Sequence, residues 1–180
     1  MAPQVLTEAA YSPDEVEFIR LLGRFKVRYL VVGGEAVIFH GYPRLTGDID
    51  FFYERTPRNV ARLFKALEMF WEKNVPGVKS ANELFEPGLV VQFGRPPNRI
   101  DLHSQIDGVF FASAWGSRVP ARLKTRSGSL RLFYIGIHSV TSKQTSCRSL
   151  QGFARCRVSR VLKEKAINQA QGMTGMHIEK

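Results

Sequence analysis

The chain has few cysteines, no long apolar run and few acidic residues. Its two cysteines, Cys147 and Cys156, are too few for a disulfide framework and lack the Cys-x-x-Cys spacing of a zinc site. No apolar stretch approaches the roughly 20 residues that a membrane-spanning helix needs. The first ten residues, MAPQVLTEAA, lack the basic and apolar regions of a signal peptide. We therefore predict a cytoplasmic protein with no structural zinc and no membrane segment.

The positive charge is unevenly distributed along the chain. The 180 residues carry a formal charge of +10, which favours a polyanionic partner. From Thr141 to Lys180, however, eight basic residues accompany only two acidic ones, so this segment holds +6 of the total. It is also poor in apolar residues. We predict one folded domain over residues 1–140 and a basic, disordered tail over residues 141–180.

The first half of the chain alternates helices and strands. Residues 12–25 predict a helix in which Ser12 and Glu15 form a capping box and Pro13 takes the first helical position. Residues 27–34 predict a strand that ends in a glycine turn, with a helix over 35–41 directly after it. A strand over 48–54 then precedes a helix over 56–73, with Thr56 as its N-cap.

The second half reads as a succession of short strands. We predict them over residues 89–94, 99–106, 109–119 and 129–136, with a turn at Asp107 and Gly108. Helices followed by a mainly antiparallel meander indicate an α+β fold, here a mixed sheet with helices packed on one face.

Two aspartates stand one residue apart where the strand over 48–54 begins. Because alternate residues of a strand share a face, Asp48 and Asp50 project together. Two ionised carboxylates at such close range repel each other, and a divalent cation such as Mg²⁺ relieves the repulsion. Taken alone, the pair is more often a solvated strand end that follows a turn, here the turn at Thr46 and Gly47.

Two further features favour phosphate chemistry. Gly33 and Gly34 lie between a strand and a helix, where exposed N–H groups attract anions, although an ordinary tight turn has the same residues. Asp101 lies between Ile100 and Leu102 within a strand, and a buried carboxylate there needs a partner. A salt bridge to an arginine satisfies it, and so does a metal shared with the aspartate pair.

The chain resembles the nucleotidyltransferase superfamily that includes DNA polymerase beta and kanamycin nucleotidyltransferase. The resemblance is carried by the segment YLVVGGEAVIFHGYPRLTGDIDFF followed later by RIDLH. The resemblance covers roughly residues 10–140 and is greatest to a small branch related to abortive-infection nucleotidyltransferases. It implies a polymerase-beta-like fold and transfer of a nucleoside monophosphate from an NTP to a hydroxyl, with release of pyrophosphate. It also implies a tRNA end, a protein side chain or a small molecule as acceptor, and a toxin–antitoxin partner.

The resemblance also assigns roles to individual residues. Gly33 and Gly34 would cradle the triphosphate, and two Mg²⁺ ions would be held by the catalytic carboxylates Asp48, Asp50 and Asp101. Apart from the resemblance, Arg44 stands just before the aspartates, where a guanidinium would clamp triphosphate oxygens, an assignment that competes with a plain surface arginine. Thr46 has a turn role or contacts phosphate, and His103, on the strand face of Asp101, is interpreted as a structural histidine near the site.

The C-terminus departs from the resemblance. Relatives in this branch end in a segment of the form N-K-x-x-x-G-R-x-K-D-x-x-D, which is absent here. One back-translation of residues 142–157, read one base later, gives ANKRAAGRFKDLRDV, which matches that ending. We therefore hypothesise that the chain from about Ser139 is a frameshifted translation.

Two alternative functions remain open at this stage. One is a catalytically inactive member that acts as an RNA-binding or toxin–antitoxin module. The other is an unrelated Mg²⁺-dependent phosphohydrolase that uses the same carboxylates.

Overall fold

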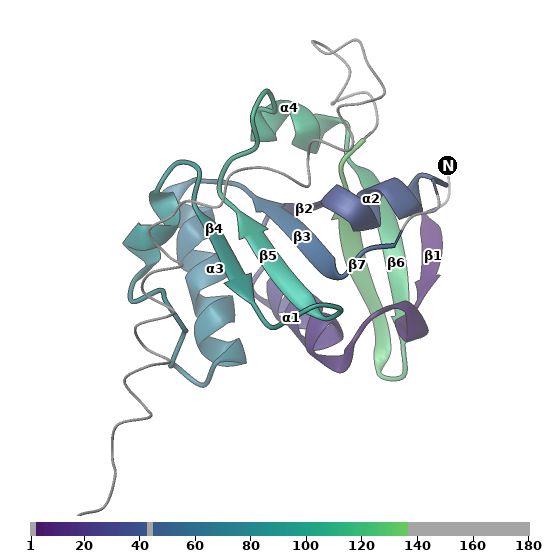
Figure 1. The fold of residues 1–180 in the computed structure, drawn as a ribbon, viewed down its shortest axis with the longest axis horizontal. Helices are drawn as coiled ribbons and strands as arrows, with labels where there is room; N and C mark the ends of the chain where they lie inside the picture. The colour runs from purple at the N-terminus through teal and green to yellow at the C-terminus, as the bar shows by residue number, and fades with distance from the viewer. Residues whose placement is uncertain (1–2, 43–44, 137–180) are drawn as a thin grey trace, which may run out of the picture.

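The computed structural model describes residues 3–42 and 45–136. Seven strands form one sheet in the order β1-β6-β7-β2-β3-β5-β4 (Figure 1). They are β1 (Gln4–Thr7), β2 (Tyr29–Val32), β3 (Asp48–Tyr53), β4 (Val90–Phe93), β5 (Arg99–His103), β6 (Val119–Thr125) and β7 (Gly128–Tyr134). The helices are α1 (Pro13–Arg24), α2 (Gly33–Phe39), α3 (Pro57–Phe70) and α4 (Phe111–Gly116), with short 3₁₀ helices η1 (Glu8–Ala10) and η2 (Ala81–Phe85).

The sheet is mixed, as predicted for an α+β fold. β1 with β6, β2 with β7, and β3 with β5 run parallel. β2 with β3, β4 with β5, and β6 with β7 run antiparallel. The parallel pair of β3 and β5 positions the polar residues described below.

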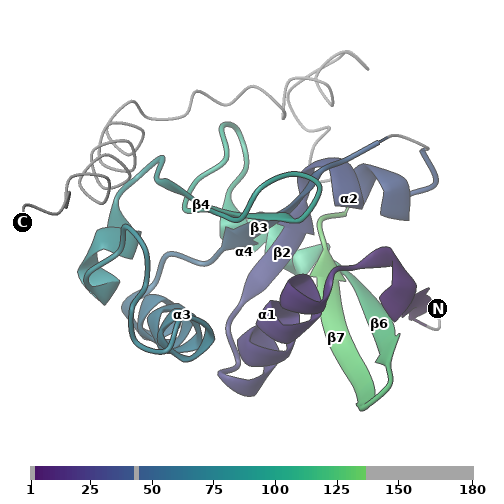
Figure 2. The ribbon, with the colours of Figure 1, turned by 60° about the horizontal axis from the view of Figure 1, so that its bottom comes forward.

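Helices α1 and α3 lie side by side under one face of the sheet (Figure 2). Phe18 of α1 contacts Phe51 of β3 and Phe70 of α3 edge to face, with ring centroids 5.7 and 5.3 Å apart. The predicted capping box starts α1, because Ser12 and Glu15 each bond the other's backbone N–H. The ring contacts form part of the core between the helices and the odd-numbered side chains of β3.

The opposite face of the sheet is covered in part by α4. Phe111 of α4 contacts Phe52 of β3, and Trp115 contacts Phe133 of β7. Phe52 points away from Phe51 because successive side chains of a strand alternate. The prediction that the helices pack on one face therefore holds for α1 and α3 and is wrong for α4.

Several local predictions are also wrong. The segment over 109–119 is largely the helix α4, and β1 and β6 were not predicted. Gly33 and Gly34 form the first turn of α2 instead of a separate turn before it. Thr56 is the N-cap of α3 by position, but its side chain makes no capping hydrogen bond.

Two predictions fall outside the described residues. These are the phosphate-binding role of Arg44 and the nature of the segment over 141–180, including the hypothesis of a frameshift from about Ser139. Within the described ranges, none of the helices has the length and hydropathy that crossing a bilayer requires.

Candidate metal centre

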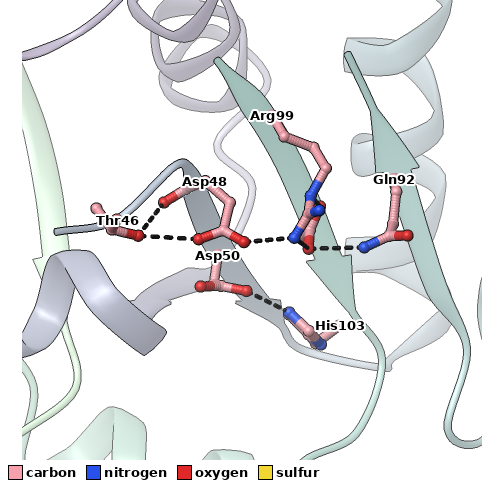
Figure 3. A network of polar contacts seen from close by, with 7 residues as sticks. Thr46, Asp48, Asp50, Gln92, Arg99 and His103 are labelled. Carbon is pink, nitrogen blue, oxygen red and sulfur yellow. Dashed lines mark hydrogen bonds and ion pairs between the residues drawn. The ribbon is translucent and has the colours of Figure 1, made fainter. Parts of the chain in front are cut away.

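The polar residues gather where β3 and β5 run side by side. In the parallel register Asp48 lies opposite Arg99, and Asp50 lies opposite Asp101. Paired residues of adjacent strands share a face, and so do alternate residues of one strand. All four side chains therefore project from the face opposite Phe51 and α1. Figure 3 shows Asp48, Asp50 and Arg99 close together at these two strands.

Arg99 connects two of the three predicted carboxylates. Its guanidinium donates from Nε to Oδ1 of Asp101 at 2.9 Å and from Nη2 to Oδ2 at 3.0 Å. Nη2 also pairs with Oδ2 of Asp48. Gln92 of β4 completes the surroundings of Asp101 by donating from Nε2 to Oδ2 at 2.8 Å. The arginine salt bridge considered for Asp101 from the sequence is therefore present.

Asp101 is the most deeply buried of these carboxylates, with 4% of its surface exposed. Burial raises the pKa of Asp101, although the hydrogen bonds from Gln92 and Arg99 act in the opposite direction. Burial by itself would lower the pKa of Arg99, but Asp101 and Asp48 raise it overall. The guanidinium of Arg99 therefore remains charged, and its positive charge offsets the repulsion between the carboxylates of Asp48 and Asp101.

Asp50 turns away from Arg99 toward a histidine. Nε2 of His103 lies 2.8 Å from Oδ1 of Asp50. Asp50, Asp101 and His103 each offer a ligand atom, and these atoms all lie within 4.8 Å of one another, so the three residues could hold a metal ion. Nitrogen and carboxylate ligands of this kind are accepted by several divalent metals.

The group of potential ligands differs in one member from the predicted triad. The sequence assigned Asp48, Asp50 and Asp101 to the metal, whereas the geometric cluster has His103 in the place of Asp48. Asp48 instead contacts Arg99 and Thr46. The signal for His103 was its position two residues after Asp101, which puts both side chains on one face of β5.

Thr46 fixes the start of β3. Its hydroxyl lies within hydrogen-bond distance of two acceptors on Asp48, the backbone oxygen at 3.0 Å and Oδ1 at 2.9 Å. The turn role considered for Thr46 therefore agrees with the structure.

Gly33 lies directly against the carboxylate of Asp50. A Cβ added to Gly33 would lie 1.9 Å from Oδ2 of Asp50, and the residue has a φ of +63°, which side chains rarely adopt. Gly34 follows as a buried residue in the same turn of α2. We call Asp48, Asp50 and Asp101 the acidic cluster. Glycine at position 33 thus allows the backbone of α2 to approach this cluster at Asp50.

A cavity of about 450 Å³ lies beside Asp48. Its described lining includes the carboxylates of Glu15, Glu35 and Asp48 and no basic side chain. Burial, followed by the charges of Glu15, Asp48 and Asp50, raises the pKa of Glu35 to about 7. The cavity therefore suits a ligand that brings positive charge, or an anion that arrives with cations.

A second cavity, of about 570 Å³, lies where β3 and β5 end. Phe52, Ser104 and Gln105 are among its lining residues, together with the exposed ring of Phe110. It has both apolar walls and hydrogen-bonding groups.

Comparisons of the chain with protein-family models, with curated proteins and with solved structures gave no match.

Proposed function

We propose that the protein is a divalent-metal-dependent nucleotidyltransferase that moves an NMP from an NTP to a hydroxyl acceptor. The observation that carries this proposal is the register of β3 and β5, which pairs Asp50 with Asp101 and brings both within ligand distance of His103. The choice of nucleotidyl transfer as the reaction rests on the sequence, in which a glycine pair, an Asp-x-Asp motif and a strand aspartate follow one another in that order.

The residues present fit a metal ion. Asp50 has a carboxylate oxygen, Oδ2, without a hydrogen-bond partner among the described residues, and Gly33 leaves the space in front of it free of a side chain. Both oxygens of Asp101 already accept hydrogen bonds, so a metal there would use their remaining lone pairs. Asp50 would be the main ligand, with Asp101 and His103 beside it. Mg²⁺ prefers oxygen ligands, and His103 extends the choice to Mn²⁺.

The proposed reaction needs the metal because the carboxylates by themselves would repel a triphosphate. A bound ion neutralises phosphate charge and lowers the pKa of the attacking hydroxyl. The chain's own carboxylates would orient the ion, and Asp50 or Asp101 would accept the hydroxyl proton. The acidic cavity beside Asp48 would take the triphosphate only together with its cations. Gly33 and Gly34 would then bring the backbone of α2 close to the phosphates.

The test is label transfer from each α-³²P-labelled NTP into total tRNA and total protein, with Mg²⁺ or Mn²⁺. Wild type should transfer label, and Asp50→Asn should reduce transfer by about 10²-fold or more, since the change removes a charge that acts on the transition state. Glu72→Gln, which changes an exposed carboxylate after α3, is the matched control and should keep wild-type activity.

Absence of transfer by a folded wild-type protein would contradict the proposal. Release of inorganic phosphate instead of pyrophosphate would identify a phosphohydrolase that uses the same residues.

A non-catalytic role is the second candidate, and the position of Arg99 favours it. This guanidinium already neutralises Asp48 and Asp101 without any metal. For a non-catalytic protein, Mg²⁺ or Mn²⁺ should leave the melting temperature unchanged, both in wild type and in Asp50→Asn. The nucleotidyltransferase should be stabilised by either ion, and Asp50→Asn should abolish that stabilisation.

A further inference from the structure

Strands β6 and β7 present cations on the sheet face that lies opposite α1. Along both strands buried and exposed residues alternate, and Arg122, Lys124 and Arg131 are exposed. Arg122 lies directly opposite Arg131 in the antiparallel register. Like charges in such a cross-strand pair destabilise a sheet unless an anion lies near them.

These cations have no partner within the part of the chain that the structure describes. None of the three makes an ion pair or a side-chain hydrogen bond there, whereas Arg20, Arg28 and Arg99 each pair with a carboxylate. The sequence explains the difference, because residues 112–136 include five basic residues and no acidic one. We call Arg118, Arg122, Lys124 and Arg131 the basic face.

Arg118 extends the basic face toward α4. Its guanidinium carbon lies 4.3 Å from the ring centroid of Trp115 and 5.5 Å from that of Phe133. Its Nη1 also donates a hydrogen bond to the backbone oxygen of Trp115 at 2.7 Å. Stacking and this bond fix the guanidinium in one orientation, and its remaining N–H groups can donate to a ligand. The face therefore ends in an arginine that is positioned in advance.

A row of aromatic rings links the basic face to the acidic cluster. Phe133 contacts Trp115, Trp115 stacks on Phe111, and Phe111 contacts Phe52, with centroids 5.1, 5.7 and 5.2 Å apart. Phe52 and Asp50 point to the same side of β3. Since β6 is three strands from β3, β6 and Asp50 are separated by about 14 Å perpendicular to the strands, and Arg122 and Arg131 lie farther away along the strand direction.

We propose that the basic face binds the phosphate backbone of a nucleic acid. Three of its four residues are arginines, whose forked donors match phosphate oxygens, and Arg122 and Arg131 lie side by side on two adjacent strands. An anionic membrane is less suitable, because binding there also uses exposed apolar side chains, and the exposed positions of β6 and β7 are mainly charged or small. The proposal goes beyond nucleotidyl transfer, and the binding does not depend on it.

The experiment measures fluorescence anisotropy of a labelled 20-nucleotide RNA, and of DNA with the same sequence, titrated with the full chain. EDTA is present and NTP is absent, so that catalysis plays no part. Arg122→Gln with Arg131→Gln should raise the Kd about tenfold, and should reduce the slope of log Kd against log salt concentration by between about 1 and 2. Comparison of the two Kd values shows whether the basic face binds RNA or DNA more tightly.

The matched control removes the same charge from the other side of the sheet. Arg58→Gln with Lys65→Gln changes two exposed residues of α3 and should leave Kd within about twofold of wild type. Both double variants keep the basic segment after Thr141, so the difference between them reports the basic face. Equal weakening by both pairs, or an unchanged Kd for the first, would overturn the proposal. Binding that depends on the two arginines for phosphatidylserine vesicles but not for either oligonucleotide would also overturn it.

Discussion

At the residue scale, Gly33 controls how closely the backbone approaches Asp50. Gly33→Ala should lower the free energy of unfolding by at least about 2 kcal/mol, because the new Cβ would overlap Oδ2 of Asp50 and the φ of +63° disfavours a side chain. Urea denaturation followed by circular dichroism measures the change.

Gly23 provides the control for this glycine prediction. It lies in α1 with nothing within 4 Å of an added Cβ, so Gly23→Ala should raise the free energy of unfolding by about 0.5 to 1 kcal/mol. Similar effects of the two substitutions would contradict the assigned role of Gly33.

The site residues differ in how far the sequence could predict them. Strand alternation placed Asp48 and Asp50 on one face, and an apolar neighbourhood marked Asp101 as a buried carboxylate in need of a partner. Which partner it has depends on Arg99, whose side chain reaches both Asp101 and Asp48. Whether Asp101 pairs with an arginine or a metal depends on the register of β3 against β5, and that register cannot be predicted from the local sequence of either strand.

At the element scale, the two long helices allow a direct comparison of their N-caps. Ser12→Ala should lower the free energy of unfolding by about 1 kcal/mol, because it removes the hydrogen bond that the backbone N–H of Glu15 donates to Oγ of Ser12. Thr56→Ala should change it by less than about 0.5 kcal/mol, because the Thr56 side chain caps nothing. Thermal unfolding of both variants measures the difference, and equal losses would contradict it.

The elements that the sequence missed are those with weak local patterns. β1 has four residues and mostly exposed side chains. β6 alternates apolar and polar residues, but it includes Pro120, which argues against a strand when the sequence is read alone. The aromatic run over 109–119 favours a strand by composition. It forms α4 because Phe111 and Trp115, four residues apart, share a helix face and pack on Phe52 and Phe133. Tertiary contacts here outweigh local preference.

At the scale of the whole molecule, the two sheet faces carry different kinds of residues. One face carries α1 and α3 and supplies most of the core, which leaves the other face for polar groups. That second face carries the acidic cluster on β3 and β5 and the basic face on β6 and β7. Negative and positive regions on one surface suit a substrate whose backbone is anionic and whose reacting end needs a cation.

The pH dependence of folding should report the acidic cavity. In the folded chain burial and the nearby carboxylates raise the pKa of Glu35 from 4.5 to about 7, so the folded state binds its proton more tightly than the unfolded state. The resulting stability is fully present below about pH 4.5 and is lost as the pH rises through 7. A shift of this size corresponds to about 3 kcal/mol, which solvent screening of a partly exposed group reduces to about 1 to 2 kcal/mol.

At pH 5, Glu35→Gln should therefore unfold at the same urea concentration as wild type or at a lower one. At pH 8, it should unfold at a higher urea concentration than wild type. The comparison between proteins isolates Glu35 from the other groups that titrate over this range, and EDTA keeps metal ions from changing the charge of the cavity. Glu86→Gln, an exposed carboxylate outside the cavity, should follow wild type at both pH values. If the difference in stability between Glu35→Gln and wild type is the same at pH 5 and pH 8, neither burial nor the carboxylates of the cavity raise the pKa of Glu35, and the prediction is wrong.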